Sequence, residues 1–106
     1  MAKDLEITRL CDAYGALLTA HRLDMIRSYY DDDLSLAEIG ENSGITRQAA
    51  LCSIRQAEKA LRGYEAALKA VEKADRLKEE LTQIRNELDE NPDGAKAALD
   101  RLISEI

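Results

Sequence analysis

The sequence contains no Phe and no Trp, so its four tyrosines are its only aromatic residues. Ala and Leu supply most of the apolar side chains, and β-branched residues are sparse. Ala and Leu have high helix propensity, whereas strands favour β-branched and aromatic residues. The composition therefore predicts an all-α fold of closely packed helices.

Cysteine, histidine and glycine are also scarce. Cys11 and Cys52 lie far apart with no CxxC or Cys/His spacing, so we expect reduced thiols and neither a zinc site nor a disulfide framework. The single histidine, His21, has no Cys or Ser partner implied by a motif, and the five glycines are too scattered for a phosphate-binding loop. We therefore expect a binding protein without cofactor or metal, and not an enzyme.

Long apolar runs are missing as well. The first residues, Met-Ala-Lys-Asp-Leu-Glu, carry charges where a signal peptide needs an apolar stretch, and no later segment approaches the length of a membrane span. These absences predict a cytoplasmic protein without membrane insertion. A chain of 106 residues suffices for one compact core, or for a small core with a projecting arm, but not for two independent domains.

The net charge of −6 argues against a protein that grips phosphate backbones non-specifically. The charge is uneven along the chain. Residues 1–34 carry four basic and seven acidic side chains (−3), residues 35–64 carry four and three (+1), and residues 65–106 carry seven and eleven (−4). Only the middle block is not acidic, so a site for an anionic partner is best sought there.

Two helices are predicted before residue 34. Apolar residues spaced three and four apart predict the first from about Lys3 to Leu18. Thr19 is a plausible N-cap for the second, which should end at the acidic run Asp31-Asp32-Asp33 because carboxylates oppose the macrodipole at a helix C-terminus. We interpret this run as a solvated turn, since adjacent carboxylates lack the spacing of a calcium loop.

The segment from Ser35 to Arg62 has the pattern of a helix-turn-helix. Ser35 and Glu38 form a capping box, so a short helix should begin at residue 36. Gly44 supplies a left-handed residue at the end of that helix, and Thr46 caps the next one. A short helix, a glycine turn and a second capped helix together indicate a helix-turn-helix.

A helical wheel divides the second of these helices into an apolar and a basic face. At about 100° per residue, Ala50, Ile54, Ala57 and Leu61 fall on one side and should be buried, with Leu36, Ile39 and Ile45 of the preceding segment. The opposite arc is basic. It contains Arg47, Gln48, Leu51, Cys52, Arg55, Lys59 and Arg62.

Residues 65–106 show a heptad-like pattern followed by a turn signal. The helix that starts after Thr46 is expected to continue to about Glu90, with Gly63 as its weak point, and Asn91-Pro92-Asp93-Gly94 should form a turn before a short last helix. This C-terminal extension should pack on the 1–64 domain or on a second subunit, as a closed hairpin or as a homodimerisation arm. The expected interface residues are Leu77, Leu81, Ile84, Leu88, Leu99, Leu102 and Ile106.

A family resemblance adds to this interpretation. The chain resembles the YlxM family over roughly Leu10 to Glu65. The residues that carry the resemblance are the runs Asp32 to Gly40 and Ile45 to Ala49, then Glu58-Lys59, Leu61 and Tyr64-Glu65, and upstream Tyr14 to Thr19 and Tyr29-Tyr30. The same block is similar to region four of bacterial sigma factors. The resemblance implies a sigma-region-four-like helix-turn-helix bundle and an accessory role near the bacterial signal recognition particle, which consists of a GTPase and a small RNA. The chain departs from the family pattern at Leu51, Cys52 and Ser53.

Three functions remain open at this point: a DNA-binding regulator, an RNA- or particle-associated accessory factor, and a protein-interaction scaffold. Arg47 and Gln48 lie in the first turn of the second helix, where helix-turn-helix proteins place base contacts. Leu51 is either a simple exposed apolar residue or a contact to a thymine methyl or a protein. The predicted nucleic-acid-binding residues are Arg47, Gln48, Leu51, Arg55, Lys59 and Arg62.

Overall fold

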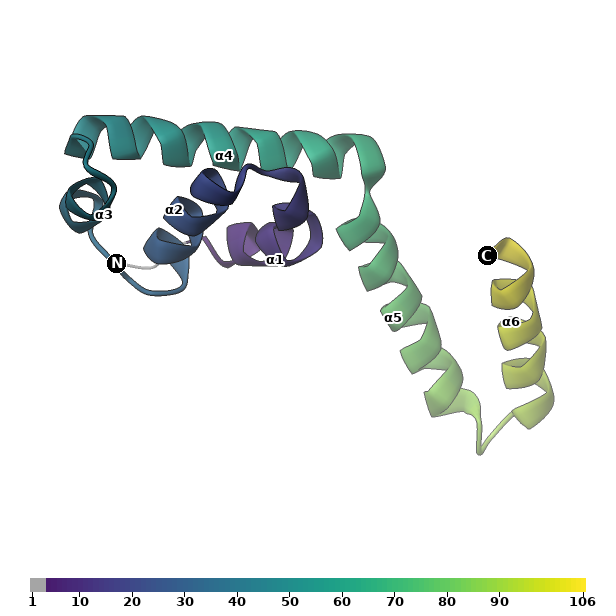
Figure 1. Cartoon of the computed structure of the whole chain (residues 1–106). Helices are drawn as coiled ribbons and strands as arrows, with labels where there is room; N and C mark the ends of the chain where they lie inside the picture. Colours follow the sequence, from purple (N-terminus) through teal and green to yellow (C-terminus); the bar gives the residue numbers. More distant parts are fainter. Residues whose placement is uncertain (1–3) are drawn as a thin grey trace. The chain divides into compact units, whose positions relative to one another are not determined.

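A computed structural model of the chain describes residues 4–106, and within this range every regular element is helical (Figure 1). The all-α fold expected from the composition is therefore confirmed. The elements are α1 (Leu5–Tyr14), the 3₁₀ helix η1 (Gly15–Leu17), α2 (Ala20–Tyr30), α3 (Leu36–Ser43), α4 (Arg47–Leu68), α5 (Ala70–Glu87) and α6 (Pro92–Glu105).

The chain divides into two compact units, Met1–Val71 (unit 1) and Glu72–Ile106 (unit 2). The boundary predicted from the sequence, after residue 64, lies inside α4. Helix α4 continues to Leu68, and Val71 still packs against the core of unit 1. The difference arises because the apolar spacing in the sequence changes at Tyr64, whereas the packing of the chain against the core of unit 1 continues beyond that residue.

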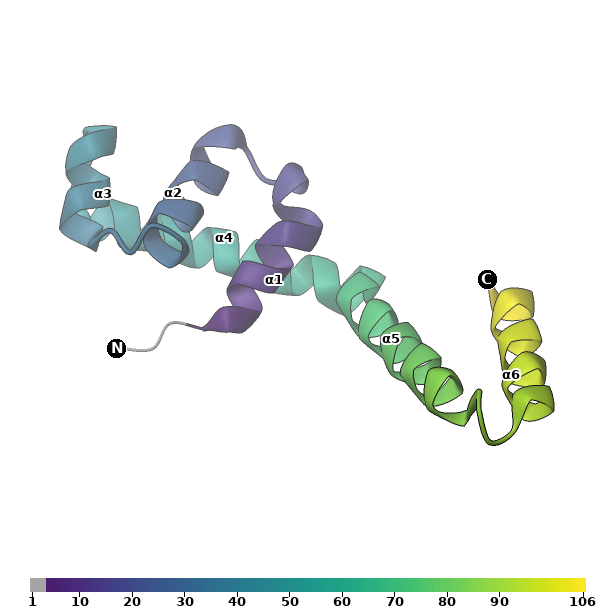
Figure 2. The ribbon, with the colours of Figure 1, turned by 90° about the horizontal axis from the view of Figure 1, so that it is seen from below.

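Unit 1 is built around the long helix α4, with α1, α2 and α3 packed along one side of it (Figures 1 and 2). Of the core residues expected in the helix-turn-helix, Ile39, Ala50, Ile54, Ala57 and Leu61 are buried, and Leu36 and Ile45 are partly buried against them. The other buried members are Ile7, Leu10, Cys11, Tyr14, Met25 and Ile26.

Local capping explains where the first helices begin. The Asp4 side chain caps α1, which ends at Tyr14 instead of Leu18 because η1 follows it; Lys3 lies outside the described residues. The predicted N-cap Thr19 accepts a hydrogen bond from the backbone N–H of Arg22, and α2 ends at Tyr30, just before the acidic run. Both ends of α2 thus agree with the sequence prediction.

Helix α4 does not continue to Glu90, so the prediction of one unbroken helix is wrong. The break lies at Lys69, which adopts the left-handed conformation with φ of 55°, whereas Gly63 lies within α4. The Tyr14 hydroxyl accepts a hydrogen bond from the Ala70 N–H (2.9 Å), and the Glu65 carboxylate accepts one from the Val71 N–H (3.0 Å). These acceptors satisfy backbone donors of the first turn of α5, which explains a break without Gly or Pro.

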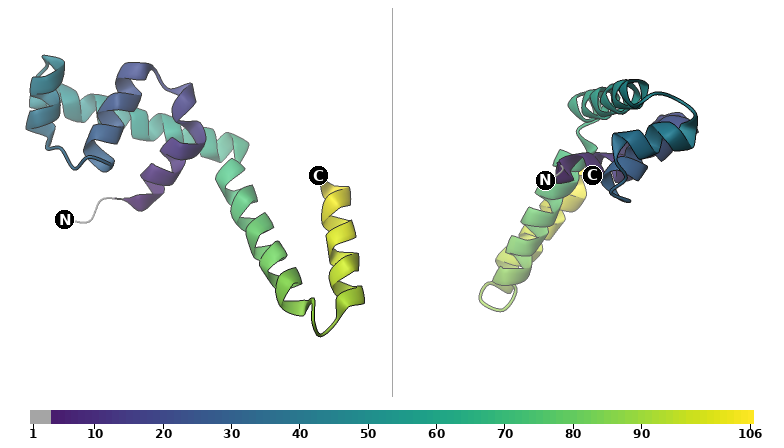
Figure 3. Two further views of the ribbon diagram at one scale, coloured as in Figure 1. Left: turned by 60° about the horizontal axis from the view of Figure 1, so that its bottom comes forward. Right: turned by 90° about the vertical axis from the view of Figure 1, so that its left-hand side faces the viewer.

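Unit 2 is an antiparallel hairpin of α5 and α6 (Figure 3). The Asn91 side chain caps α6 and Pro92 occupies its first turn, so the predicted turn residues begin the last helix instead of preceding it. The hairpin has a small core of Ile84, Ala95 and Leu102, with Ala98 and Leu99 partly buried beside it. Several larger apolar residues of unit 2 remain exposed.

Candidate nucleic-acid interface

The helix-turn-helix holds the start of α4 in a fixed position relative to α3. The capping box of Ser35 and Glu38 is formed in both directions, and Gly44 has the left-handed φ of 70° that the turn requires. A Cβ on Gly40 would lie 2.8 Å from the carbonyl oxygen of Ile45, so only glycine permits the observed approach of α3 to the turn. The Thr46 hydroxyl accepts from the Ala49 N–H (3.0 Å) and so caps α4.

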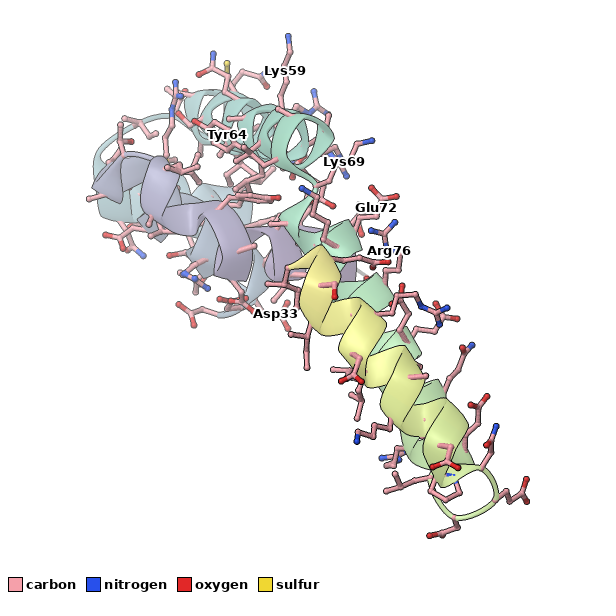
Figure 4. All side chains as sticks on the ribbon, turned by 90° about the vertical axis from the view of Figure 1, so that its right-hand side faces the viewer. Asp33, Lys59, Tyr64, Lys69, Glu72 and Arg76 are labelled. Carbon is pink, nitrogen blue, oxygen red and sulfur yellow. The ribbon has the colours of Figure 1, made fainter. Side chains whose placement is uncertain are left out.

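The basic arc of the helical wheel lies on the side of α4 that faces away from the core. We call the predicted residues Arg47, Gln48, Leu51, Arg55, Lys59 and Arg62 the α4 face. All of them are exposed except Leu51, which is partly buried. Figure 4 shows Lys59 projecting outward from the helix. The structure therefore brings the predicted residues together on one solvent-facing surface.

One cation of the α4 face is already compensated within the protein. Arg62 donates a hydrogen bond to the carboxylate of Asp4 (3.0 Å), and both side chains are about half exposed. Such an exposed pair contributes little to stability. It does lower the positive charge at this end of the face, so Arg47, Arg55 and Lys59 are the cations left for an anionic ligand.

Two residues that the sequence pattern does not predict, Arg22 and Gln56, lie beside the α4 face. Arg22 of α2 donates a hydrogen bond to the side-chain oxygen of Gln56 (2.8 Å), and the Gln56 amide in turn lies 3.7 Å from the sulfur of Cys52. Arg22 thus adds a cation at the edge of the surface. A wheel drawn for α4 alone contains no signal for this residue, because the contact depends on how α2 packs against α4.

Two glutamates of α4 are held by tyrosines from the N-terminal helices. Tyr30 donates to Glu58 and Tyr14 donates to Glu65, each at 2.5 Å. Burial raises the pKa of both phenols above the ordinary value, and the neighbouring carboxylate raises it further. These bonds hold α4 against α1 and α2. They also direct two carboxylates of α4 toward the tyrosines and away from an anionic ligand.

The residues expected to form a dimer interface fall into two groups. Ile84 and Leu102 are buried and Leu99 is partly buried inside the hairpin, where they close α5 on α6. The remaining members are at least one-third exposed. They are Leu77 (36%), Leu81 (43%), Leu88 (51%) and Ile106 (90%).

The described part of the chain offers little else that would bind a ligand. Residues 4–106 contain no group of three or more His, Cys, Asp or Glu side chains arranged to hold a metal ion. None of the helices described is both long and apolar enough to cross a membrane. Cys11 is buried and Cys52 is exposed, and both are free thiols.

Comparisons with known proteins agree with the geometry. The model of the UPF0122 family, described as "Putative helix-turn-helix protein, YlxM / p13 like", matches residues 1–100. A UPF0122 protein of Latilactobacillus sakei is 46% identical over 64 residues, which cover 60% of this chain and 57% of the relative. One from Symbiobacterium thermophilum is 48% identical over 63 residues, covering 58% and 59%. The matched region thus spans less than two thirds of each relative.

Proposed function

The chain belongs to the UPF0122 family of YlxM/p13-like helix-turn-helix proteins, and from this premise we propose that it is a non-enzymatic binding protein for a nucleic acid or nucleoprotein. The observation that carries the proposal is the outward arrangement of Arg47, Arg55 and Lys59 on a helix whose opposite side is fully packed. The first turn of α4, with Arg47 and Gln48, would contact the ligand as a recognition helix does.

The proposed setting is the signal recognition particle pathway in the cytoplasm. This assignment comes from the family resemblance, with the particle RNA as the proposed ligand and the particle GTPase as the proposed protein partner. The acidic balance of the chain supports a specific ligand over general phosphate binding, since the net charge is −6. Binding is therefore expected to depend on the shape or sequence of the ligand and to be weak for unrelated nucleic acids.

Leu51 gives a specific reason to keep duplex DNA as the second candidate. It lies between Arg47 and Arg55 on the α4 face and is only partly buried. An apolar side chain at this position of a recognition helix can contact the methyl group of thymine in the major groove, and uracil in RNA lacks that methyl. The alternative function is a DNA-binding transcriptional regulator.

A titration of the full chain against the particle RNA and against duplex DNA, at several salt concentrations, tests the proposal. If the three available cations of the α4 face contact phosphates, a plot of the logarithm of the binding constant against the logarithm of the salt concentration should have a slope of about −3 for duplex DNA. The slope should be shallower for a single strand. A preference for RNA that persists at moderate salt supports the accessory function, and a preference for duplex DNA that Leu51→Ala weakens supports the regulator. Absence of binding to both would leave a protein-interaction scaffold.

A further inference from the structure

Helix α2 crosses α4 at a steep angle, so its two ends reach different flanks of α4 (Figure 2). Arg22, near the start of α2, donates to Gln56, and Tyr30, at its end, donates to Glu58. The donors lie about 12 Å apart along α2, whereas their partners lie about 3 Å apart along α4. Around α4, the two partners are separated by about 160°. The start of α2 therefore lies on the flank that carries Gln56.

The flank of α4 that Arg22 reaches carries cations and no carboxylate. Glu58 and Glu65 are the only acidic residues of α4, and both lie about 160–180° around the helix from Gln56. Lys59 is exposed, three residues after Gln56 and about 60° around the helix from it. The charge of Arg22 therefore adds to that of Lys59 without an acid of α4 on the same flank.

The elements around the start of α2 also keep their acids away from Arg22. The chain contains no acidic residue from residue 13 to residue 23. Asp24 lies about 160° around α2 from Arg22, and it lines the hollow between α2 and α3. On α3, Asn42 and Ser43 line this hollow, whereas Glu41 lies on the far side of that helix. The surface around Arg22 is thus open to an anion.

The partner that orients Arg22 is neutral, whereas Arg27 and Arg62 are each paired with carboxylates at 3.0 to 3.5 Å. A carboxylate compensates the charge of a guanidinium, but the Gln56 amide orients Arg22 and leaves its charge available. The amide is itself held, because its nitrogen lies 3.7 Å from the sulfur of Cys52. No other side-chain contact of Arg22 exists within residues 4–106, so its remaining donors can bind two phosphate oxygens at once.

The position of Arg22 relative to the first turn of α4 fits a contact to the backbone of the ligand. Gln56 lies about 13 Å beyond Arg47 along α4. The major groove of duplex DNA is about 12 Å wide, and a recognition helix contacts bases with its first residues. A cation this far along the helix, at its flank, therefore lies level with phosphates and not with base edges. RNA offers the same phosphodiester groups.

We propose that Arg22 binds a phosphate of the nucleic acid, with Gln56 as the positioning residue that orients its guanidinium. The backbone of the ligand then passes over Lys59 and Gln56 onto the start of α2. This inference rests on the proposed function and extends the interface beyond α4. With Arg22 included, the salt slope of the wild type for duplex DNA should be about −4 instead of about −3.

Salt-dependent titrations of full-length variants with the particle RNA and with duplex DNA test this contact. Arg22→Gln should weaken binding by about fivefold or more at low salt and make the slope shallower by about 1. Arg22→Lys retains the charge and should retain the slope. Arg27→Gln makes the same change in net charge on the same helix, at an arginine that carboxylates already compensate, and should keep the affinity within about twofold.

Gln56→Glu separates a role in ligand binding from a role in packing. It places a carboxylate on Arg22, so the contact between α2 and α4 is kept and the melting temperature should not fall. Binding should nevertheless weaken at least as much as in Arg22→Gln, because the charge of Arg22 is then compensated within the protein.

The possible outcomes distinguish this inference from the proposed function. If the wild type binds and Arg22→Gln has the same affinity as Arg27→Gln, the inference is overturned and the proposed function stands. Wild-type affinity of Gln56→Glu would overturn it as well. A wild type that binds neither the RNA nor the duplex would refute the proposed function, and this inference with it.

Discussion

At the residue scale, the two tyrosine–glutamate bonds predict a particular response to high pH. Burial raises the pKa of both phenols, and ionising Tyr14 or Tyr30 would also break its bond and place a negative charge beside a carboxylate, which raises the pKa further. Because the folded state favours the protonated phenol, this stabilisation is complete below the ordinary tyrosine pKa of about 10 and is lost as the pH rises above it.

An ultraviolet titration of phenolate formation measures this directly. Tyr14 and Tyr30 should ionise later than an unperturbed tyrosine, so Tyr14→Phe and Tyr30→Phe should each remove part of the late phase of the titration. If either variant instead removed signal from the early phase, that phenol would be in contact with water and not with its glutamate.

Burial in the core of unit 1 predicts a large effect of one substitution in α4. Ile54 is 1% exposed, so Ile54→Asp would bury an unpaired carboxylate and should unfold the domain. The milder Ile54→Ala should lower the free energy of unfolding by about 2–5 kcal/mol. Ala66→Asp, at an exposed position of the same helix, is the matched control and should change it by less than about 1 kcal/mol. Wild-type thermal stability of Ile54→Asp would refute the assigned register.

At the element scale, local signals predicted the helix starts well, and distant contacts caused the main error. The capping box at Ser35, the caps at Thr19 and Thr46 and the left-handed Gly44 are all short-range features, and the structure contains each of them. The break at Lys69 has no such signal. Its acceptor Tyr14 is 56 residues away from Ala70 in sequence, so only the folded chain brings the two together.

The break at Lys69 can be tested by the sign of a stability change. A non-glycine residue in the left-handed region costs about 1 kcal/mol or more, so Lys69→Gly should raise the free energy of unfolding by about 1 kcal/mol. Lys73→Gly, inside α5, should lower it by a similar amount. Chemical denaturation of both variants measures these changes in the free energy of unfolding. Destabilisation by Lys69→Gly would show that α4 and α5 form one continuous helix after all.

At the scale of the whole molecule, the basic surface was only partly predictable from the sequence. The wheel placed Arg47, Arg55 and Lys59 on one side of α4 correctly, because helical geometry alone decides that. It could not show that Asp4 pairs with Arg62 or that Arg22 lies beside Gln56, since these contacts join separate helices. The structure therefore reduces the number of cations that the α4 face offers to a ligand, and it adds one cation from α2 beside that face.

The most direct test of the central claim is to reverse Arg47 and Arg55 together and measure binding to the particle RNA and to duplex DNA. Both side chains are exposed, so Arg47→Glu with Arg55→Glu should keep the wild-type melting temperature. Lys73→Glu with Lys96→Glu makes the same change in net charge in unit 2 and serves as the control.

The account predicts that the Arg47 and Arg55 double variant loses detectable binding to the ligand that the wild type prefers, while the control keeps its affinity within a few-fold. The salt slope of any residual duplex binding should be shallower by about 2, since two phosphate contacts are lost. Equal binding by the wild type and the double variant would contradict the claim that the α4 face is the nucleic-acid interface.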